Sequence, residues 1–259
     1  MNYLIRTLKG FIYKNYIRFY EKKYNHLKYC FFSSGCNKSL LVVFSGFPGG
    51  GSIPKYNYLK TLRKVKSNKL FLLDDVYNPV NVGSYYLGSN GDWYLVDDII
   101  NLISTIVEDN KIDKVITIGS SKGGSSALYY GIKIKADFCI IGAPQYHVGT
   151  YLSSVNHQPI MDVIMGNHNS ESINKLNCYI KDEIFNHNSK KPKIFIHYSP
   201  KEHTYQDHIR DLIKDLNHAG YEIKEDNDYY YERHSDVKDF FPNYLIKTLK
   251  SIEATNKNS

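Results

Sequence analysis

The sequence is poor in cysteine and lacks long hydrophobic runs, and each absence excludes a class of protein. Its four cysteines among 259 residues form no C-x-x-C pair, so neither a disulfide-built scaffold nor a metal site is expected. No run reaches the roughly 18 apolar residues that a membrane-spanning helix needs. The N-terminus also lacks the apolar stretch and small-residue cleavage site of a secretory signal. Together these absences favour a cytoplasmic protein.

Positive charge is present, but it is concentrated at the N-terminus. The formal net charge is +7 at pH 7. Residues 1–28 hold seven basic side chains and a single acid, Glu21, so six of these seven charges lie there and the rest of the chain is nearly neutral. A nucleic-acid-binding domain usually spreads its basic side chains over one face of the fold. The distribution therefore argues against nucleic acid as a partner.

Residues 1–25 form the first predicted unit, a basic amphipathic helix. Leu4, Leu8 and Phe11 recur at roughly helical spacing, with lysine and arginine between them. One interpretation is a helix that rests on an anionic membrane or docks to a partner. The other is a terminal helix that packs on its own domain, and the tyrosines and asparagines that dilute the apolar face favour it.

Residues 26–259 alternate short apolar strands with amphipathic helices. Strands are expected at residues 27–32, 40–44, 69–73, 115–118, 138–141, 194–197, 221–224 and 229–232. Helices are expected at residues 95–107, 125–132, 205–216 and 237–249. The first two strands flank a turn-rich segment, as in a hairpin. The alternation predicts an α/β fold with a mostly parallel sheet and helices on both faces. Residues 146–190 fit it least well and are interpreted as a lid or insertion over the carboxyl ends of the strands.

The segment Gly119-Ser-Ser-Lys-Gly123 matches the pattern G-x-S-x-G between a buried strand and a helix. A serine at its centre occupies a sharp turn, which the flanking glycines permit because they lack a Cβ atom. Its hydroxyl then lies beside a helix N-terminus, which favours developing negative charge. The pattern alone is common by chance, and the alternative is a plain loop of small residues. Strand, turn and helix in this order favour Ser121 as a nucleophile.

A glycine-rich segment follows the strand at residues 40–44. An acyl-transfer serine needs backbone N–H groups that stabilise the oxyanion of its tetrahedral intermediate. We expect these donors from Gly46 or Phe47 and from Lys122, the residue after the nucleophile. The alternative is a flexible loop. A phosphate-binding loop is disfavoured because no Gly-Lys-Ser/Thr follows the glycines.

In this fold the nucleophile, the acid and the histidine follow one another along the chain. Of ten histidines, His234 lies between the last predicted strand and the last helix, so it is the expected general base. Glu202 lies in the preceding loop and is the expected acid, which would orient the imidazole. Asp207 competes with Glu202, whose alternative role is that of a first-turn helix acid. His203 and His208 are interpreted as structural or substrate-facing, and an exposed loop histidine remains the alternative for His234.

These residues resemble a group of bacterial surface-polysaccharide proteins with an α/β-hydrolase-like fold. The group includes capsule O-acetyltransferases, capsular polysaccharide biosynthesis proteins and the acetyltransferase component of accessory Sec systems. The resemblance spans about residues 40–245, and its most specific part is Gly-Ser-Ser-Lys-Gly-Gly at 119–124. Further matching segments are Phe44-Ser-Gly-Phe-Pro48, Lys55-Tyr-Asn-Tyr58, Gly83-Ser-Tyr-Tyr86, Ala143-Pro-Gln145 and Ser199-Pro-Lys-Glu-His-Thr-Tyr205.

The resemblance implies a serine-dependent O-acetyltransferase. Ser121 would be the nucleophile, His234 the base and Glu202 the acid. Acetyl-CoA would be the donor, and a sugar hydroxyl of a capsular or other surface polysaccharide would be the acceptor. From the matching segments, Gln145 and Tyr85 are assigned to substrate binding.

Two other functions stay open beside the transferase. A carbohydrate esterase or deacetylase would use the same triad, because water hydrolyses the same acyl-enzyme when it reaches the site. A non-catalytic component of a polysaccharide or glycoprotein export complex would use the fold as a scaffold. In each case residues 1–25 are a candidate contact to the inner face of the membrane or to capsule assembly machinery.

Overall fold

The structure, a computed structural model, describes residues 17, 19–35, 37–48, 54–77, 83–186 and 190–255. Its centre is an eight-stranded sheet in the order β1-β2-β4-β3-β5-β6-β7-β8. The strands are β1 (Glu21–Tyr24), β2 (Leu27–Phe32), β3 (Ser39–Phe44), β4 (Asn68–Leu73), β5 (Lys114–Ser120), β6 (Phe138–Gly142), β7 (Lys193–His197) and β8 (Ile223–Asp226). The six strands β3 to β8 run parallel to one another. At one edge, β2 pairs antiparallel with β4, and β1 pairs antiparallel with β2.

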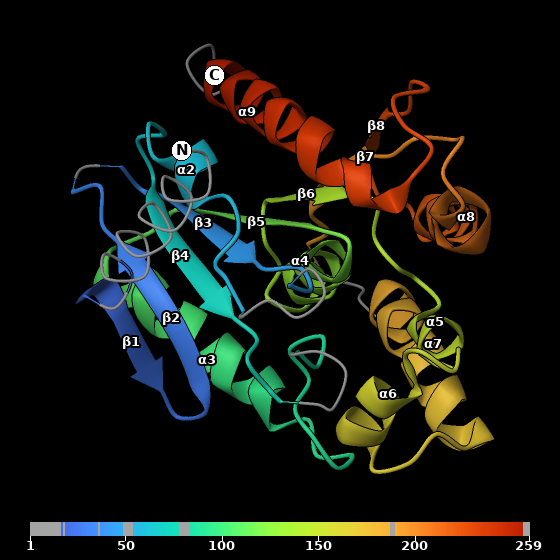
Figure 1. Cartoon of the computed structure of the whole chain (residues 1–259). Coiled ribbons are helices and arrows are strands. Elements are labelled where there is room, and N and C mark those ends of the chain that lie inside the picture. Colours follow the sequence, from blue (N-terminus) through green and yellow to red (C-terminus); the bar gives the residue numbers. More distant parts are fainter. Residues whose placement is uncertain are drawn as a thin grey trace, which may run out of the picture.

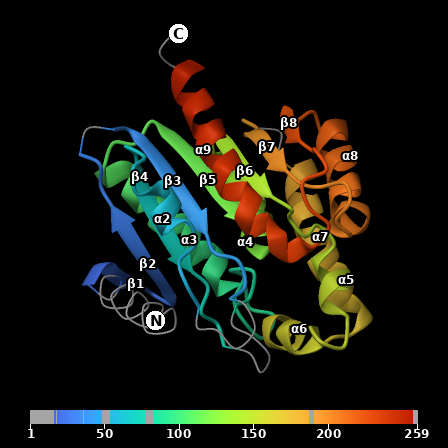
Figure 2. The same ribbon diagram turned by 45° about the horizontal axis from the view of Figure 1, so that its top comes forward.

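Helices cover both faces of the sheet, as predicted. They are α2 (Leu59–Leu62), α3 (Tyr94–Asp109), α4 (Lys122–Lys133), α5 (Val148–Leu152), α6 (Gln158–Met165), α7 (Ser170–Asn186), α8 (Arg210–His218) and α9 (Val237–Thr255). Helices α3 and α4 lie against one face and α9 with α2 against the other (Figures 1 and 2). No helix in the described ranges is both long and apolar enough to cross a membrane.

The sequence pattern explains the core on both sides of the sheet. Strand β3 is buried from Leu40 to Phe44, which is why it is an uninterrupted apolar run. Helix α3 turns one stripe to the sheet, with the buried residues Leu95, Val96, Ile99, Leu102, Ile103 and Ile106. Each such aliphatic side chain contributes about 1.5–3 kcal/mol by leaving water. The predicted helix at 95–107 is therefore confirmed.

Residues 21–24 form strand β1 and not the end of the predicted N-terminal helix. The strand pairs with β2 from Glu21 opposite Cys30 to Tyr24 opposite Leu27. Asn25, at φ 48°, adopts the left-handed conformation that a two-residue hairpin turn requires. The helix prediction was wrong here because cross-strand pairing outweighs a diluted amphipathic pattern. Residues 1–16 and 18 of the predicted helix lie outside the described residues.

Two further expectations about strands were wrong. Strands β2 and β3 form no hairpin, because β4 lies between them, antiparallel to β2 and parallel to β3. The side chain of Asn68, at the start of β4, holds this connection by accepting a hydrogen bond from the backbone N–H of Ser34 at 2.9 Å. Residues 229–232 are also not a strand. They belong to the loop that carries the chain from edge strand β8 to His234.

The segment 146–190 is a helical insertion between β6 and β7. Helix α7 returns alongside α4, and an ion pair between Lys133 and Glu183 at 2.8 Å joins them. Helix α6 contacts the turn at residues 89–92, where Asn90 and Gly91 donate backbone hydrogen bonds to its last turn. The insertion is thus helical throughout its described elements. That it acts as a lid stays a prediction.

Candidate active site

Ser121 occupies a sharp turn between β5 and α4. Its backbone has φ 55° and ψ −130°, a conformation that a non-glycine residue adopts only under local constraint. A Cβ atom on Gly119 would lie 2.0 Å from the carbonyl oxygen of Gly123, and one on Gly123 would lie 2.4 Å from that of Phe44. Both glycines of the motif are therefore required by close backbone contacts. The predicted strand, turn and helix are present.

His234 contacts this serine and Glu202 contacts His234, and both residues follow strands that run parallel to β5. Nε2 of His234 lies 2.7 Å from Oγ of Ser121, and Nδ1 of His234 lies 3.2 Å from Oε1 of Glu202. The contact to Glu202 is within ion-pair range, although the N–H of the imidazole is not well aligned with the carboxylate. Glu202 follows β7, and His234 begins the 3-10 turn before α9. The three predicted residues thus form a serine–histidine–glutamate arrangement.

Glu202 is buried, with 1% of its surface exposed. Thr204 donates its backbone N–H to Oε1 at 3.2 Å and its hydroxyl to Oε2. Burial alone would raise the pKa of Glu202, but the close approach of His234 and the hydrogen bonds from Thr204 outweigh it and hold the pKa below its ordinary value. The carboxylate is therefore charged at neutral pH and can stabilise an imidazolium.

The competing acid lies elsewhere. Asp207 is exposed, and in the described part of the chain its carboxylate makes no ion pair or hydrogen bond. The two histidines interpreted as structural or substrate-facing have different partners. Nδ1 of His203 lies 3.2 Å from Oε1 of Glu202. His208 is buried and accepts the backbone N–H of His147 at 3.3 Å, and burial lowers its pKa to about 4.

The expected oxyanion donors lie close to the turn at Ser121, which is called the elbow below. A Cβ atom on Gly46 would lie 3.4 Å from the carbonyl oxygen of Ser120, so the loop after β3 runs beside the nucleophile. Lys122 is the first residue of α4, where backbone N–H groups have no acceptor within the helix. The ring of Phe47 packs under the Lys122 ammonium at 5.0 Å. The positions suit oxyanion stabilisation, and the role of each donor stays a prediction.

Lys122 also forms a buried ion pair that sequence reasoning missed. Its Nζ lies 2.7 Å from Oδ2 of Asp74, and both side chains are almost fully buried. Burial lowers the pKa of Lys122, and Asp74 opposes that shift. Asp74 also accepts the backbone N–H groups of Ser84 and Tyr86 at 2.7 and 3.0 Å. The pair therefore joins the residues after β4 to the turn at Ser121. The sequence sign that could have indicated a buried partner is a lysine within a motif of otherwise small residues.

The two residues assigned to substrate binding have different surroundings. Nε2 of Gln145 lies 3.0 Å from Oγ of Ser121, so Gln145 reaches the nucleophile. Tyr85 is fully buried, and its ring packs edge-on against Phe47 at 5.5 Å. The assignment of Tyr85 to substrate binding stays a prediction.

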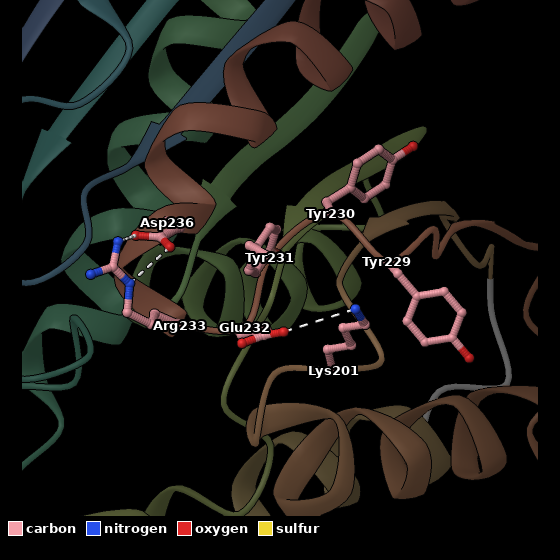
Figure 3. Close-up of a pocket in the computed structure, with 7 residues that line it drawn as sticks. All are labelled: Lys201, Tyr229, Tyr230, Tyr231, Glu232, Arg233 and Asp236. Carbon is pink, nitrogen blue, oxygen red and sulfur yellow. Dashed lines mark hydrogen bonds and ion pairs between the residues drawn. The ribbon is translucent and has the colours of Figure 1, made fainter.

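A pocket of about 350 Å³ lies beside the loops that carry the acid and the base (Figure 3). Its lining residues are Lys201, Tyr229, Tyr230, Tyr231, Glu232, Arg233 and Asp236. Lys201 precedes Glu202 and Arg233 precedes His234, so the pocket shares both loops with these two residues. The ring of Tyr229 is 71% exposed. Sequence reasoning missed this pocket, because it interpreted residues 229–232 as a strand.

The described residues contain no cluster of metal-ligating side chains. Among them, no three histidine, cysteine, aspartate or glutamate side chains are grouped as a metal ion would require. The side chains that converge at the elbow are those of Ser121, His234, Glu202 and Gln145, which offer a hydroxyl, an imidazole, a carboxylate and an amide.

A nucleophile after β5, an acid after β7 and a histidine after β8 define the α/β-hydrolase class of fold. The capsule O-acetyltransferase of Neisseria meningitidis serogroup A is similar to this chain, with a TM-score of 0.75 and 22% identity over 89% of this chain and 94% of that chain. A mutant of that acetyltransferase in complex with CoA has a TM-score of 0.72, with 20% identity over 88% of this chain and 93% of that chain.

The family is shown by sequence. The family model described as "Accessory Sec system GspB-transporter" matches residues 10–254, so the chain belongs to this accessory Sec system family. It is 31% identical to an accessory Sec system protein of Staphylococcus aureus over 136 residues, which are 51% of this chain and 24% of that protein. The match thus spans about a quarter of the relative. A chain of the Gap123 glycosylation-associated complex of Streptococcus agalactiae is also similar, with a TM-score of 0.69 and 21% identity over 86% of this chain and 44% of that chain.

Proposed function

We propose that this protein is an O-acetyltransferase that moves an acetyl group from acetyl-CoA to a sugar hydroxyl through an acetyl-serine intermediate. The acceptor is a capsular or other surface polysaccharide. The observation that carries the proposal is the 2.7 Å contact between Ser121 and His234, on a strained turn and beside a buried carboxylate. Similarity to a capsule O-acetyltransferase that has been solved with CoA supports the choice of donor.

In the first half-reaction, Ser121 attacks the thioester. Its Oγ bonds to the acetyl carbon while its proton passes to Nε2 of His234. Glu202 stabilises the imidazolium that forms. Backbone N–H groups of Lys122 and of Gly46 or Phe47 hold the oxyanion. The carbon–sulfur bond then breaks, and the thiolate of CoA takes the proton from His234.

In the second half-reaction, the acceptor hydroxyl attacks the acetyl-serine. Its oxygen bonds to the acetyl carbon, and its proton passes to His234. The bond to Oγ of Ser121 breaks, and the serine recovers its proton from the imidazolium. Transfer in place of hydrolysis requires that a sugar hydroxyl is held close and that water is kept out. We assign residues 146–190 a part in this exclusion, as a lid over the site.

The acceptor glycan would occupy the pocket beside the triad. Tyr229 offers an exposed aromatic face on which the C–H groups of a sugar ring can pack. Glu232 and Asp236 supply acceptors for sugar hydroxyls, and Lys201 and Arg233 supply donors. The pocket volume of about 350 Å³ suits a small part of a glycan chain. Because the pocket shares its loops with Glu202 and His234, a bound chain would run toward the catalytic groups.

Membership of the accessory Sec system family favours a second role, as a component of an export complex for polysaccharide or glycoprotein. We expect the protein on the cytoplasmic side, peripheral to the inner face of the membrane. Residues 1–25 would make that contact or the contact to assembly machinery. A carbohydrate esterase remains the alternative activity for the same triad.

Intact-protein mass spectrometry tests the proposal. Wild type, Ser121→Ala and the matched neighbour Ser120→Ala are mixed with acetyl-CoA without an acceptor. One added acetyl group on wild type and Ser120→Ala, but not on Ser121→Ala, is the expected result. An equal adduct on Ser121→Ala would exclude this nucleophile. Rapid release of acetate without an acceptor would favour the esterase, and no reaction in any protein would favour a non-catalytic role.

A further inference from the structure

The side chain of Gln145 lies beside both reacting groups of the site. Its Nε2 is 3.0 Å from Oγ of Ser121 and 3.5 Å from Nε2 of His234. These two atoms are themselves 2.7 Å apart. The amide therefore lies on the imidazole side of the serine. That is the side from which a leaving group departs and a second nucleophile arrives, because the oxyanion donors are on the loop after β3 and at the start of α4.

The backbone around Gln145 is held from two directions. Gln145 is buried, with 1% of its surface exposed. Its carbonyl oxygen accepts a hydrogen bond from the hydroxyl of Ser125 in α4 at 2.6 Å. Two residues earlier, Ala143 has φ 38° and donates its N–H to the carbonyl of His197 at 2.8 Å. These contacts fix the backbone of the segment to helix α4 and to strand β7, so the carboxamide can leave its position only by rotation of the Gln145 side chain.

Hydrolysis of an acetyl-serine needs a water in a defined place. The water must lie about 3 Å from the carbonyl carbon bonded to Oγ and within hydrogen-bond reach of the base, Nε2 of His234. The amide nitrogen of Gln145 lies 3.0 Å from Oγ, to which that carbon would be bonded, and 3.5 Å from Nε2, so it lies beside the path of such a water. Two heavy atoms cannot share this space. The carboxamide and an attacking water would therefore compete for the space beside the imidazole.

We propose that Gln145 determines whether the acetyl-serine is transferred or hydrolysed, by keeping water from it. The inference rests on the proposed acetyl-serine intermediate. A polyhydroxylated acceptor has binding contacts of its own, so it can displace the carboxamide and bring a hydroxyl to the acetyl carbon. Oε1 of Gln145 is buried without a hydrogen-bond partner among the described residues, so it is available to accept a hydrogen bond from such a molecule.

The test measures how fast Ser121 loses its acetyl group in water. p-Nitrophenyl acetate is the donor, because an activated ester acylates a serine triad without recognition of CoA. After the ester is removed, mass spectrometry of the intact protein follows the decay of the acetyl-enzyme. Gln145→Ala opens the space, and Gln145→Met keeps most of its volume without the hydrogen bonds. Gln206→Ala, on the exposed side of the turn before α8, is the matched control.

We expect the acetyl group of Gln145→Ala to decay at least about tenfold faster than that of wild type, with Gln145→Met and Gln206→Ala within about threefold. Equal decay of wild type and Gln145→Ala would overturn the inference, and so would fast decay of Gln145→Met. Thermal melting shows whether each variant is folded. If no acetyl-Ser121 forms from the ester, the proposed function fails as well. If it forms from the ester but not from acetyl-CoA, only the proposed donor fails.

Discussion

Two histidine–carboxylate pairs lie at neighbouring positions on the carboxyl edge of the sheet, and only one of them meets a nucleophile. His234 contacts Glu202 at 3.2 Å and Ser121 at 2.7 Å. His197, the last residue of β7, contacts Asp226 at 2.6 Å through Nδ1. Its Nε2 is buried and has no hydrogen-bond partner within the described ranges. A histidine paired with a carboxylate thus occurs once with a serine hydroxyl at its other nitrogen and once without a hydrogen-bond partner there among the described residues.

The two imidazoles also differ in how far they are exposed to solvent. His197 is 1% exposed, whereas the side chain of His234 is 23% exposed. Aromatic rings surround His197, namely those of Tyr230, Tyr231, Phe241 and Tyr244. Burial lowers the pKa of His197 although Asp226 opposes the shift, so its neutral form is favoured. The pair of His197 and Asp226 is therefore interpreted as structural. The pair of His234 and Glu202 differs from it by the serine hydroxyl at Nε2 of the imidazole.

The largest expected effect separates the two histidines by rate. His234→Ala should lower the rate of Ser121 acetylation by about 10³-fold or more, because the serine loses its general base. His197→Ala should retain most of the rate per folded molecule. Rates from single-turnover mass spectrometry, corrected for the folded fraction, check this. A similar loss in both variants would mean that the two regions act as one unit.

The acid provides the second contrast. Glu202→Gln should lower the acetylation rate on the order of 10²-fold, less than His234→Ala, because the imidazolium loses its buried counter-charge. Asp207→Asn, an exposed carboxylate a few residues away, should stay near wild type. If Asp207→Asn were slower than Glu202→Gln, the assignment of the acid would be wrong.

The buried pair should matter for stability instead. His197→Ala removes a buried ring and one of the two described side-chain partners of the Asp226 carboxylate, the other being the hydroxyl of Tyr230. We expect the free energy of unfolding to fall by about 2 kcal/mol. Urea denaturation gives this value. His234→Ala should change it far less, since its side chain is partly exposed, and a reversed order would contradict the division between the two regions.

Acid should weaken the fold through its buried histidines. Burial lowers the pKa of His208 from 6.5 to about 4 and lowers that of His197 as well. The unfolded chain binds these protons below about pH 6.5, while the folded chain does so only at lower pH. Stability is therefore fully present above about pH 6.5 and falls as the pH drops toward 4. Melting temperatures across this range should show a flatter slope for His208→Gln, but an unchanged slope for exposed His218→Gln.

The smallest effect concerns the pocket that lies between the two pairs. Its residue Tyr230 donates a hydrogen bond to Asp226 at 2.8 Å, while Arg233 at its other end precedes His234. Tyr229→Ala should raise the KM for the acceptor glycan about threefold to tenfold, because one aromatic contact is lost. Acetylation of Ser121 should not change. Tyr77→Ala, a similarly exposed tyrosine outside the pocket, is the control, and a matching rise in its KM would refute the pocket as a subsite.

Much of the helical layer and the elbow were predictable from short stretches of sequence. Helix α3 follows from its apolar stripe, and the turn at Ser121 follows from two glycines that lie within five residues. The strand order was not predictable, since β4 enters between β2 and β3 only after an intervening segment. Strand β1 was missed because a four-residue edge strand has too few residues for a periodicity to be evident.

The sequence by itself predicted the turn at Ser121, the position of His234 and the alternation of strands and helices, because glycine requirements, chain order and hydrophobic periodicity are properties of short segments. Only the tertiary structure decided which groups meet. His234 reaches Ser121 across 113 residues, and Asp74 reaches Lys122 across 48. Gln145 comes beside the nucleophile because β5 and β6 are neighbours in the sheet. Such contacts depend on the packing of distant segments, and no local pattern records the distance between two side chains.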